Sequence, residues 1–406
     1  WLKLARLGKS QPSFAFSRGW PALVRPPHGR RMAAPGASGS AGAGNANADG
    51  ASETWELVSK ATDEELKRRR SPILFAACTG DFILTGSCRP MVQLWRLGEG
   101  EITHHGTLKS IAAPTCIECA QDQNQVAISA QNGQILLFDL REQQRAATIL
   151  PSTMAQATTV CFVGDSHRLA TGGCSGKLCL WDLRRPHTVE VEIPPYLDLN
   201  GAAKEENGEV GRPSNPSNPS KRRREGSTEP PETPEVSHRI SSLCASHDGQ
   251  LIACGRDSGY VALLRLQTLQ WVTGDVEAHM KGGAVRSLSF DQRSRFLLSG
   301  GDDSNVCLMD AGHWSSQGRK PCVERFLAHR KRVTSLKVSP DLREQLAVST
   351  SWDGLVKLWD YRTQRLLCSF DEHVPSPVTA LAFAPVDGRF FVTTGGDAKL
   401  ALFARR

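Results

Sequence analysis

Seven short apolar segments recur along the chain, and each ends on a large or aliphatic residue. Within each segment aliphatic side chains dominate, which favours a buried β-strand. The last residues of consecutive segments lie 43, 43, 83, 45, 50 and 44 positions apart. The seven segments are Val92–Trp95, Ile135–Phe138, Leu178–Trp181, Val261–Leu264, Val306–Met309, Val356–Trp359 and Leu400–Phe403.

The last repeat shows the internal anatomy most clearly. Val378–Phe383 alternates as a strand, Ala384–Gly388 has turn residues, and Phe390–Thr394 reads as a second strand. Gly395–Asp397 then forms a tight turn into the recurrent apolar segment. Similar Gly/Asp turns occur at Gly300–Asp303, Trp352–Gly354 and Arg256–Gly259.

A period of about 40 to 45 residues with several strands in each copy is typical of propeller blades. The sequence therefore predicts an all-β, seven-bladed β-propeller over residues 53–406. The chain stops at Arg406, after the third strand of the seventh blade. We expect Thr54–Val58 to supply the missing strand and close the ring, which removes exposed strand edges.

Two low-complexity regions flank or interrupt the repeats. Residues 1–52 are predicted to be a disordered or non-native segment, with Met32 as the natural start, although the Arg-bearing, acid-free residues 1–31 also fit a mitochondrial transit peptide. Residues 194–235, between the third and fourth blades, are predicted to be a disordered loop. Within it Lys221, Arg222, Arg223 and Arg224 form either a nuclear-localisation signal or solvated charge.

Charge and cysteine usage narrow the functional classes. Residues 1–31 carry seven positive charges and no acidic residue, which accounts for the whole net charge of +7. The remaining residues therefore have a net charge of zero. The repeats therefore lack the positive field that phosphate binding needs, and RNA is expected as an indirect partner only. No apolar run is long enough to span a membrane, and we expect a soluble protein. Scattered cysteines fit a reducing compartment.

No cofactor or metal is predicted. The pair Cys116 and Cys119 lies in a predicted strand, where two thiols three positions apart face opposite sides. No second pair completes a zinc site.

His329, Asp353 and Trp359 form a candidate polar set, and His279 and His373 precede the fifth and seventh blades in the same way. A catalytic role would need a nucleophile nearby, and we expect none. The interpretation is a buried network that fixes a turn onto a strand, so the chain is predicted not to be an enzyme.

Loops that converge on one face of a propeller are expected to bind partners, with aromatic and Arg side chains as anchors. The candidates are Trp352, Arg256, Asp302, Arg330 and Arg332. Packing of Trp352 against a neighbouring blade is the alternative for that residue.

The stretches Trp181–Arg184 and Trp359–Arg362 match the W-D-x-R core found in substrate receptors of cullin-type ubiquitin ligases. The alternative is that they mark the end of a third strand, where Arg lies along the surface.

Residues 53–406 resemble the WD-repeat β-propeller family, and within it the WD-repeat subunit of the superkiller complex. The resemblance rests on Ala157–Phe162 with Leu169–Gly173, on Val285–Leu288 through Asp302–Asp303, and on Gly396–Leu400. The loop at 194–235 and the endings Leu264–Arg265 and Leu308–Met309 depart from the family's pattern.

This resemblance implies a non-catalytic scaffold, monomeric within a hetero-complex, that binds a helical-repeat scaffold protein. A helicase in that complex feeds RNA to the cytoplasmic exosome, and the related subunit is also counted in a nuclear elongation complex. Cytoplasmic and nuclear locations are therefore expected. A cullin-type ligase receptor, or an adaptor of a nuclear chromatin or transcription complex, is the alternative.

Overall fold

The computed structural model describes residues 54–405, apart from gaps at 69–70, 99–100, 121–123, 142–147, 151–156, 165–166, 186–188, 194–238, 273–274, 281, 318–320, 322, 343–344 and 386–387. The predictions for residues 1–52, for the loop at 194–235 and for the basic cluster Lys221–Arg224 therefore lie outside the described residues.

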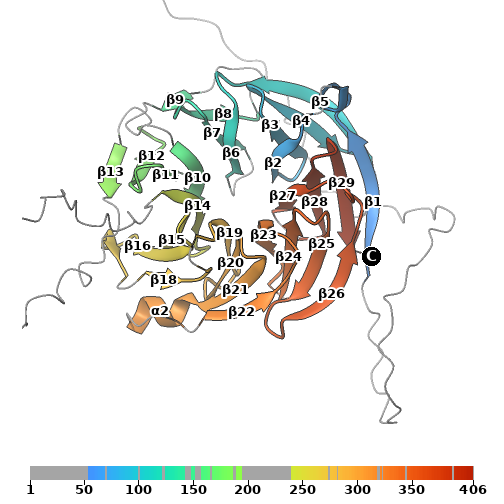
Figure 1. Ribbon diagram of the computed structural model, residues 1–406. Coiled ribbons are helices and arrows are strands. Elements are labelled where there is room, and N and C mark those ends of the chain that lie inside the picture. The colour runs from blue at the N-terminus through green and yellow to red at the C-terminus, as the bar shows by residue number, and fades with distance from the viewer. Residues whose placement is uncertain are drawn as a thin grey trace, which may run out of the picture. The chain divides into compact units, whose positions relative to one another are not determined.

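The described residues form seven antiparallel sheets that stand like blades around a central axis (Figure 1). In each blade the chain starts at the innermost strand and moves outward. The seven predicted segments all fall on the third strand of a blade, so the predicted fold is confirmed.

The first three blades each contain four strands in sequence order. Their bounds are β2 (Ile73–Cys78), β3 (Phe82–Ser87), β4 (Met91–Leu97) and β5 (Ile102–Lys109); β6 (Pro114–Cys119), β7 (Gln125–Ala130), β8 (Ile135–Asp139) and β9 (Thr148–Leu150); and β10 (Ala157–Val163), β11 (Arg168–Gly173), β12 (Leu178–Asp182) and β13 (Val189–Ile193).

In the fourth blade two short strands, β17 and β18, both pair with β16 and together form the outer edge. The strands of the fourth blade are β14 (Ile240–Ala245), β15 (Leu251–Arg256), β16 (Tyr260–Arg265), β17 (Gln270–Trp271) and β18 (Val276–Glu277). The fifth blade consists of β19 (Val285–Phe290), β20 (Phe296–Gly301), β21 (Asn305–Asp310) and β22 (Val323–Leu327), and the sixth of β23 (Val333–Val338), β24 (Leu346–Ser351), β25 (Val356–Asp360) and β26 (Arg365–Phe370). The seventh contains β27 (Val378–Phe383), β28 (Phe390–Gly395) and β29 (Lys399–Arg405).

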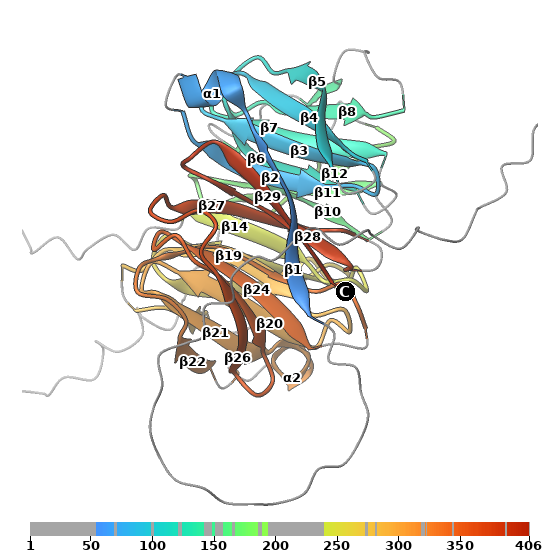
Figure 2. The same ribbon diagram turned by 90° about the vertical axis from the view of Figure 1, so that its right-hand side faces the viewer.

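The seventh blade takes its fourth strand from the beginning of the described chain. Strand β1 (Trp55–Thr62) pairs antiparallel with β29, from Trp55 opposite Arg405 to Thr62 opposite Lys399. Figure 2 shows β1, in blue, lying along the last blade. The strand is longer than the predicted Thr54–Val58, and a bulge between Leu57 and Ser59 interrupts its register.

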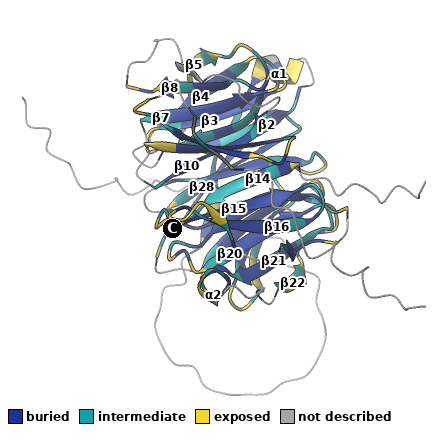
Figure 3. Ribbon diagram, turned by 90° about the vertical axis from the view of Figure 1, so that its left-hand side faces the viewer, coloured by how far each residue is buried: buried dark blue, intermediate teal, exposed yellow. Residues whose placement is uncertain are grey.

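The core consists of seven apolar clusters, one at each contact between neighbouring blades. A middle strand such as β28 faces two neighbouring blades, so its side chains are buried on both sides, including the hydroxyls of Thr393 and Thr394. An outer strand such as β26 is largely exposed. In Figure 3 the strands are mostly buried or intermediate, in dark blue and teal, and many of the exposed residues, in yellow, lie in turns.

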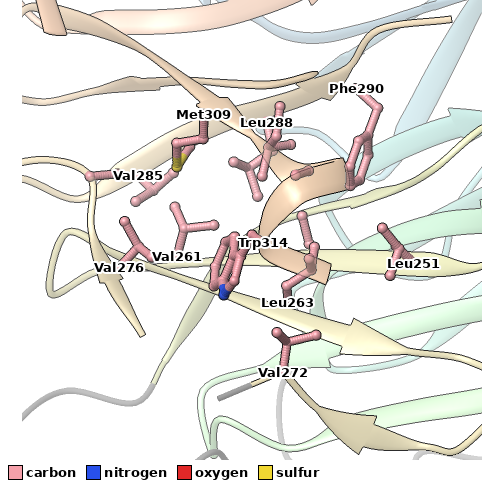
Figure 4. Packing of buried hydrophobic residues seen from close by; sticks show 14 residues of the cluster. Leu251, Val261, Leu263, Val272, Val276, Val285, Leu288, Phe290, Met309 and Trp314 are labelled. Carbon is pink, nitrogen blue, oxygen red and sulfur yellow. The ribbon is translucent and has the colours of Figure 1, made fainter. Parts of the chain in front are cut away.

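Two short helices accompany the strands, α1 (Glu64–Arg68) and α2 (Ala311–Gln317). Helix α2 replaces a simple turn after β21, and the sequence did not predict it. Its Trp314 is fully buried between the fourth and fifth blades, beside Val261, Leu263 and Met309 (Figure 4). Neither of the two described helices has the length and apolar composition needed to cross a membrane.

The thiols of Cys116 and Cys119 have different surroundings. Cys116 contacts the carbonyl of Val160 in the third blade, whereas Cys119 packs against the cluster between the first two blades. Within the described residues, no group of His, Cys, Asp or Glu side chains could hold a metal ion.

Deleting residues 52–60 is expected to lower the melting temperature sharply, because β29 then loses its outer partner and Trp55 leaves its contacts with Phe383 and Phe391. The single change Trp55→Ala should cost about 3–5 kcal/mol of unfolding free energy. Thermal and urea unfolding followed by circular dichroism measure both effects. A deletion variant that melts with the wild type would contradict ring closure.

Candidate functional site

Three blades contain the same buried polar set at equivalent positions. In the sixth blade, His329 Nδ1 lies 3.1 Å from an Asp353 carboxylate oxygen and its Nε2 lies 2.8 Å from Ser349 Oγ. The fifth blade repeats this with His279, Asp303 and Ser299, and the seventh with His373, Asp397 and Thr393. The predicted set of His329, Asp353 and Trp359 is therefore joined through a hydroxyl that sequence reasoning missed.

The hydrogen-bond roles follow from what each group can donate. The Trp359 indole N–H can only donate, and it reaches Ser349 Oγ at 2.8 Å. Asp353 is held as a carboxylate and accepts from His329 Nδ1–H, and the other ring nitrogen, Nε2, shares a hydrogen bond with the Ser349 hydroxyl. The first and third blades keep the same contact between a Trp and a hydroxyl, Trp95 to Thr85 and Trp181 to Thr171.

The carboxylates of these sets are held in their charged form. Burial works against the charge of Asp353, but hydrogen bonds from His329 and from the backbone N–H groups of Arg330 and Leu355 keep its pKa below the ordinary value. Asp303 and Asp397 behave alike, because His279 and His373 outweigh the effect of burial and lower their pKa values.

A hydroxyl, an imidazole and a carboxylate in this order have the geometry of a hydrolase triad. The expectation that no nucleophile lies near these His residues was therefore wrong, because a Ser or Thr hydroxyl lies within hydrogen-bonding distance of each ring. The hydroxyl has no access to a substrate, however, because Ser349 is fully buried and also accepts the Trp359 N–H. The repetition of the same His, hydroxyl and carboxylate set in the neighbouring blades supports a structural role.

Ionisable groups also approach each other on the innermost strands. Burial raises the pKa of Glu118 on β6, and the charge of Glu118 raises the pKa of Lys337 on β23. Burial also raises the thiol pKa values of Cys116, Cys161 and Cys244. Protonated thiols and a firmly protonated amine are poor nucleophiles, so this group lacks the activation that covalent catalysis needs.

A position that recurs in several blades defines a common face of the ring. There the residue after the second strand donates its N–H to the residue that precedes the first strand, as Trp352 does to Arg332 at 3.2 Å. The same bond links Asp257 to Arg239, Asp302 to Ala284 and Gly396 to Pro377. We call this side the Trp352 face, after the residue that protrudes most clearly from it.

Two predicted partner-binding residues meet on this face. The Arg332 guanidinium lies over the Trp352 ring, 3.5 Å from its centroid, and 44% of Trp352 remains exposed. Nearly half of the Trp352 side chain is therefore open to solvent. Arg330 stands beside them, with its backbone N–H bound to Asp353 and its side chain exposed.

Asp302 lies on the same face, but its carboxylate is engaged. Both of its oxygens accept hydrogen bonds from Arg286, at 2.8 and 2.6 Å. Arg286 was not among the predicted residues.

Arg256 does not fit the expectation of a surface anchor, because it is buried and its guanidinium lies 2.6 Å from Asp275. By strand register it stands where the fifth and seventh blades have Gly301 and Gly395. Those glycines lie against the His rings of their blades, where a Cβ would clash with Nδ1. Arg256 and Asp275 therefore form the buried polar contact of the fourth blade.

The two W-D-x-R stretches both engage their Arg within the propeller. Arg184 donates two hydrogen bonds to Asp182 at 2.9 Å, and this contact lowers the pKa of Asp182 to about 2. Arg362 lies over the ring of Phe296, 4.3 Å from its centroid. Both contacts fit an Arg that lies along the propeller surface.

Comparison with known proteins agrees with this geometry. The family model described as "WD domain, G-beta repeat" matches residues 149–182, 271–310 and 320–360. These three segments match WD repeats. The second and third matched segments contain the His, hydroxyl and Asp residues of the buried sets in the fifth and sixth blades. The first contains Trp181 and Thr171 of the third blade.

The curated relatives are distant. The chain is 23% identical to the ribosome biogenesis protein WDR12 homolog of Culex quinquefasciatus over 80% of this chain and 70% of that protein. It is 27% identical to protein hir-1 of Neurospora crassa, over 40% of this chain and 18% of the relative. It is 26% identical to human DDB1- and CUL4-associated factor 10, over 31% of this chain and 23% of that protein. The chain thus spans only a small part of the last two relatives.

Asp353→Asn should lower stability at neutral pH by about 1.5–3 kcal/mol, the usual contribution of a hydrogen bond to a charged group. Because the folded pKa of Asp353 lies below its ordinary value, this stabilisation is present above that value and is lost as pH falls. The difference in melting temperature between wild type and variant should therefore shrink below about pH 4.

Thermal melts from neutral to acidic pH measure this difference. The exposed Asp371→Asn is the control and should follow the wild type throughout. A gap that stays constant down to acidic pH would exclude a contribution from the charge of Asp353.

Proposed function

We propose that this chain is a non-catalytic adaptor that holds proteins of a nuclear assembly on the Trp352 face of its ring. The observation that carries the proposal is the stacked pair of Trp352 and Arg332, which is exposed on a surface fixed by blade packing. Tryptophan and arginine dominate the binding energy of protein interfaces, and a preorganised pair loses little entropy on binding.

Three further points support this proposal. The triad-like sets are buried and serve the blade structure, which leaves them no route to a substrate. One relative is named for ribosome biogenesis and another for association with DDB1 and CUL4, and both are similar to this chain. The sequence also contains the basic cluster Lys221–Arg224, which fits a nuclear-localisation signal.

A substrate receptor of a cullin-type ubiquitin ligase is the second candidate. The similarity to the DDB1- and CUL4-associated factor and the two W-D-x-R stretches favour it. The relatives described above do not include a superkiller subunit, so that resemblance stays a prediction. It would place the chain beside a helical-repeat scaffold and a helicase.

Affinity purification of the tagged full chain followed by mass spectrometry tests these assignments. We expect a partner in stoichiometric amount with the wild type and with Leu342→Ala, a control that removes another exposed apolar side chain (62%), outside the Trp352 face. Trp352→Ala should reduce recovery about tenfold or more, as for an interface anchor.

The identity of the partner separates the candidates. A cullin adaptor indicates a ligase receptor, a helical-repeat protein with a helicase indicates the superkiller complex, and a chromatin, transcription or ribosome-assembly subunit indicates a nuclear adaptor. Absence of any stoichiometric partner would contradict the adaptor proposal as a whole.

A further inference from the structure

Three successive blades expose the residue that follows their buried His. These residues are Met280, Arg330 and Val374, of which Met280 is 68% and Val374 51% exposed. The loops that carry them alternate with the turns of the Trp352 face. Ser304 accepts the backbone N–H groups of Ala328 and His329, and the side chain of Val374 lies against Gly354. The fifth, sixth and seventh blades therefore present one continuous surface.

Three consecutive cations lie at the centre of this surface. Among the described residues, no ion pair involves the side chains of Arg330, Lys331 or Arg332. The carboxylates beside them are engaged elsewhere, since Asp302 binds Arg286 and Asp353 binds His329. The positive charge of this loop is thus available to an acidic group from outside.

The Trp352 ring provides an apolar surface next to these cations. Arg332 covers one face of the ring, and the remaining exposed surface adjoins the turn against which Val374 lies. A cation held over an indole keeps the side chain in one orientation. The surface therefore offers an oriented aromatic and an aliphatic side chain beside three positive charges.

We propose that the basic-aromatic patch, defined by Arg330, Lys331, Arg332, Trp352 and Val374, binds an acidic peptide segment that carries one large apolar residue. The inference rests on the proposed adaptor function and specifies the chemistry of its partner. Carboxylates of the segment pair with the cations, and the apolar residue packs between Trp352 and Val374.

Charge distribution and apolar content favour a peptide over a nucleic acid. Apart from residues 1–31 the chain has no net positive charge. At the same register of other blades, Arg239 and Arg286 are paired with Asp257 and Asp302, so these positions do not extend the three cations into a track for a phosphate backbone. One face of Trp352 is occupied by Arg332, which leaves a single face for a base. Exposed Val374 and Met280 gain from burial against an apolar side chain but not against ribose or phosphate.

Fluorescence anisotropy with the purified full chain tests the proposal. The probe is a fluorescein-labelled peptide in which a single Phe is flanked on both sides by Glu residues. The matched peptides replace every Glu with Gln, or the Phe with Ala, and a labelled single-stranded oligouridylate serves as the nucleic-acid probe. The variants are Trp352→Ala and Lys331→Glu, with Leu342→Ala and the exposed Lys109→Glu as controls.

We expect the Glu/Phe peptide to bind more tightly than either matched peptide. Trp352→Ala should weaken it about tenfold, and Lys331→Glu roughly fivefold, an effect that salt should reduce. Both controls should bind like the wild type, and melting curves of all variants establish that they are folded.

No binding of the Glu/Phe peptide, equal binding of the Gln peptide, or tighter binding of the oligouridylate that depends on Trp352 would each overturn the proposal. The adaptor function has a separate outcome. Loss of a stoichiometric partner from Trp352→Ala in the purification, without binding of this peptide, leaves the adaptor function standing and rejects the acidic segment.

Discussion

The structure depends on the hydrogen bonds between β1 and β29. Every other blade is completed by strands that follow one another in sequence, but the seventh needs a strand from more than 330 positions earlier in the chain. Because each apolar cluster lies between two blades, an open ring would expose the faces of both terminal blades. Closure therefore holds all seven contacts at once. It also makes the Trp352 face a surface whose loops keep fixed relative positions.

Within this ring, each blade fixes its turns by its own polar chemistry. The fifth, sixth and seventh blades use a His between a carboxylate and a hydroxyl, whereas the fourth uses Arg256 with Asp275. A small residue before the turn leaves room for the His ring, and an Arg at the same register occupies that room instead. The fifth blade adds helix α2, whose Trp314 fills the space beside the fourth. The blades therefore share one turn arrangement but hold it with different polar groups.

This divergence explains what the sequence predicted and what it did not. Blade number, the third strands and the closing strand follow from a period and an alternation that burial imposes on every copy. Ser349 was missed because a single serine gives no signal until strand pairing places it beside His329 and Trp359. Arg256 has the same sequence context as a surface turn residue, and only the position of Asp275 on the outer edge of its blade shows that it is buried. Helix α2 has seven residues, too few for a helical period to stand out.

The same reasoning explains why the basic-aromatic patch lies on the sixth blade. At the register of Trp352 the fourth, fifth and seventh blades carry Asp257, Asp302 and Gly396, and the two acids are paired with Arg239 and Arg286. Those pairs neutralise charge on the surface itself. In the sixth blade an aromatic ring replaces the acid, so Arg332 stacks on it and keeps its charge unpaired among the described residues. The buried set of His329, Ser349 and Asp353 fixes the turn from inside, which leaves part of the Trp352 side chain exposed to solvent.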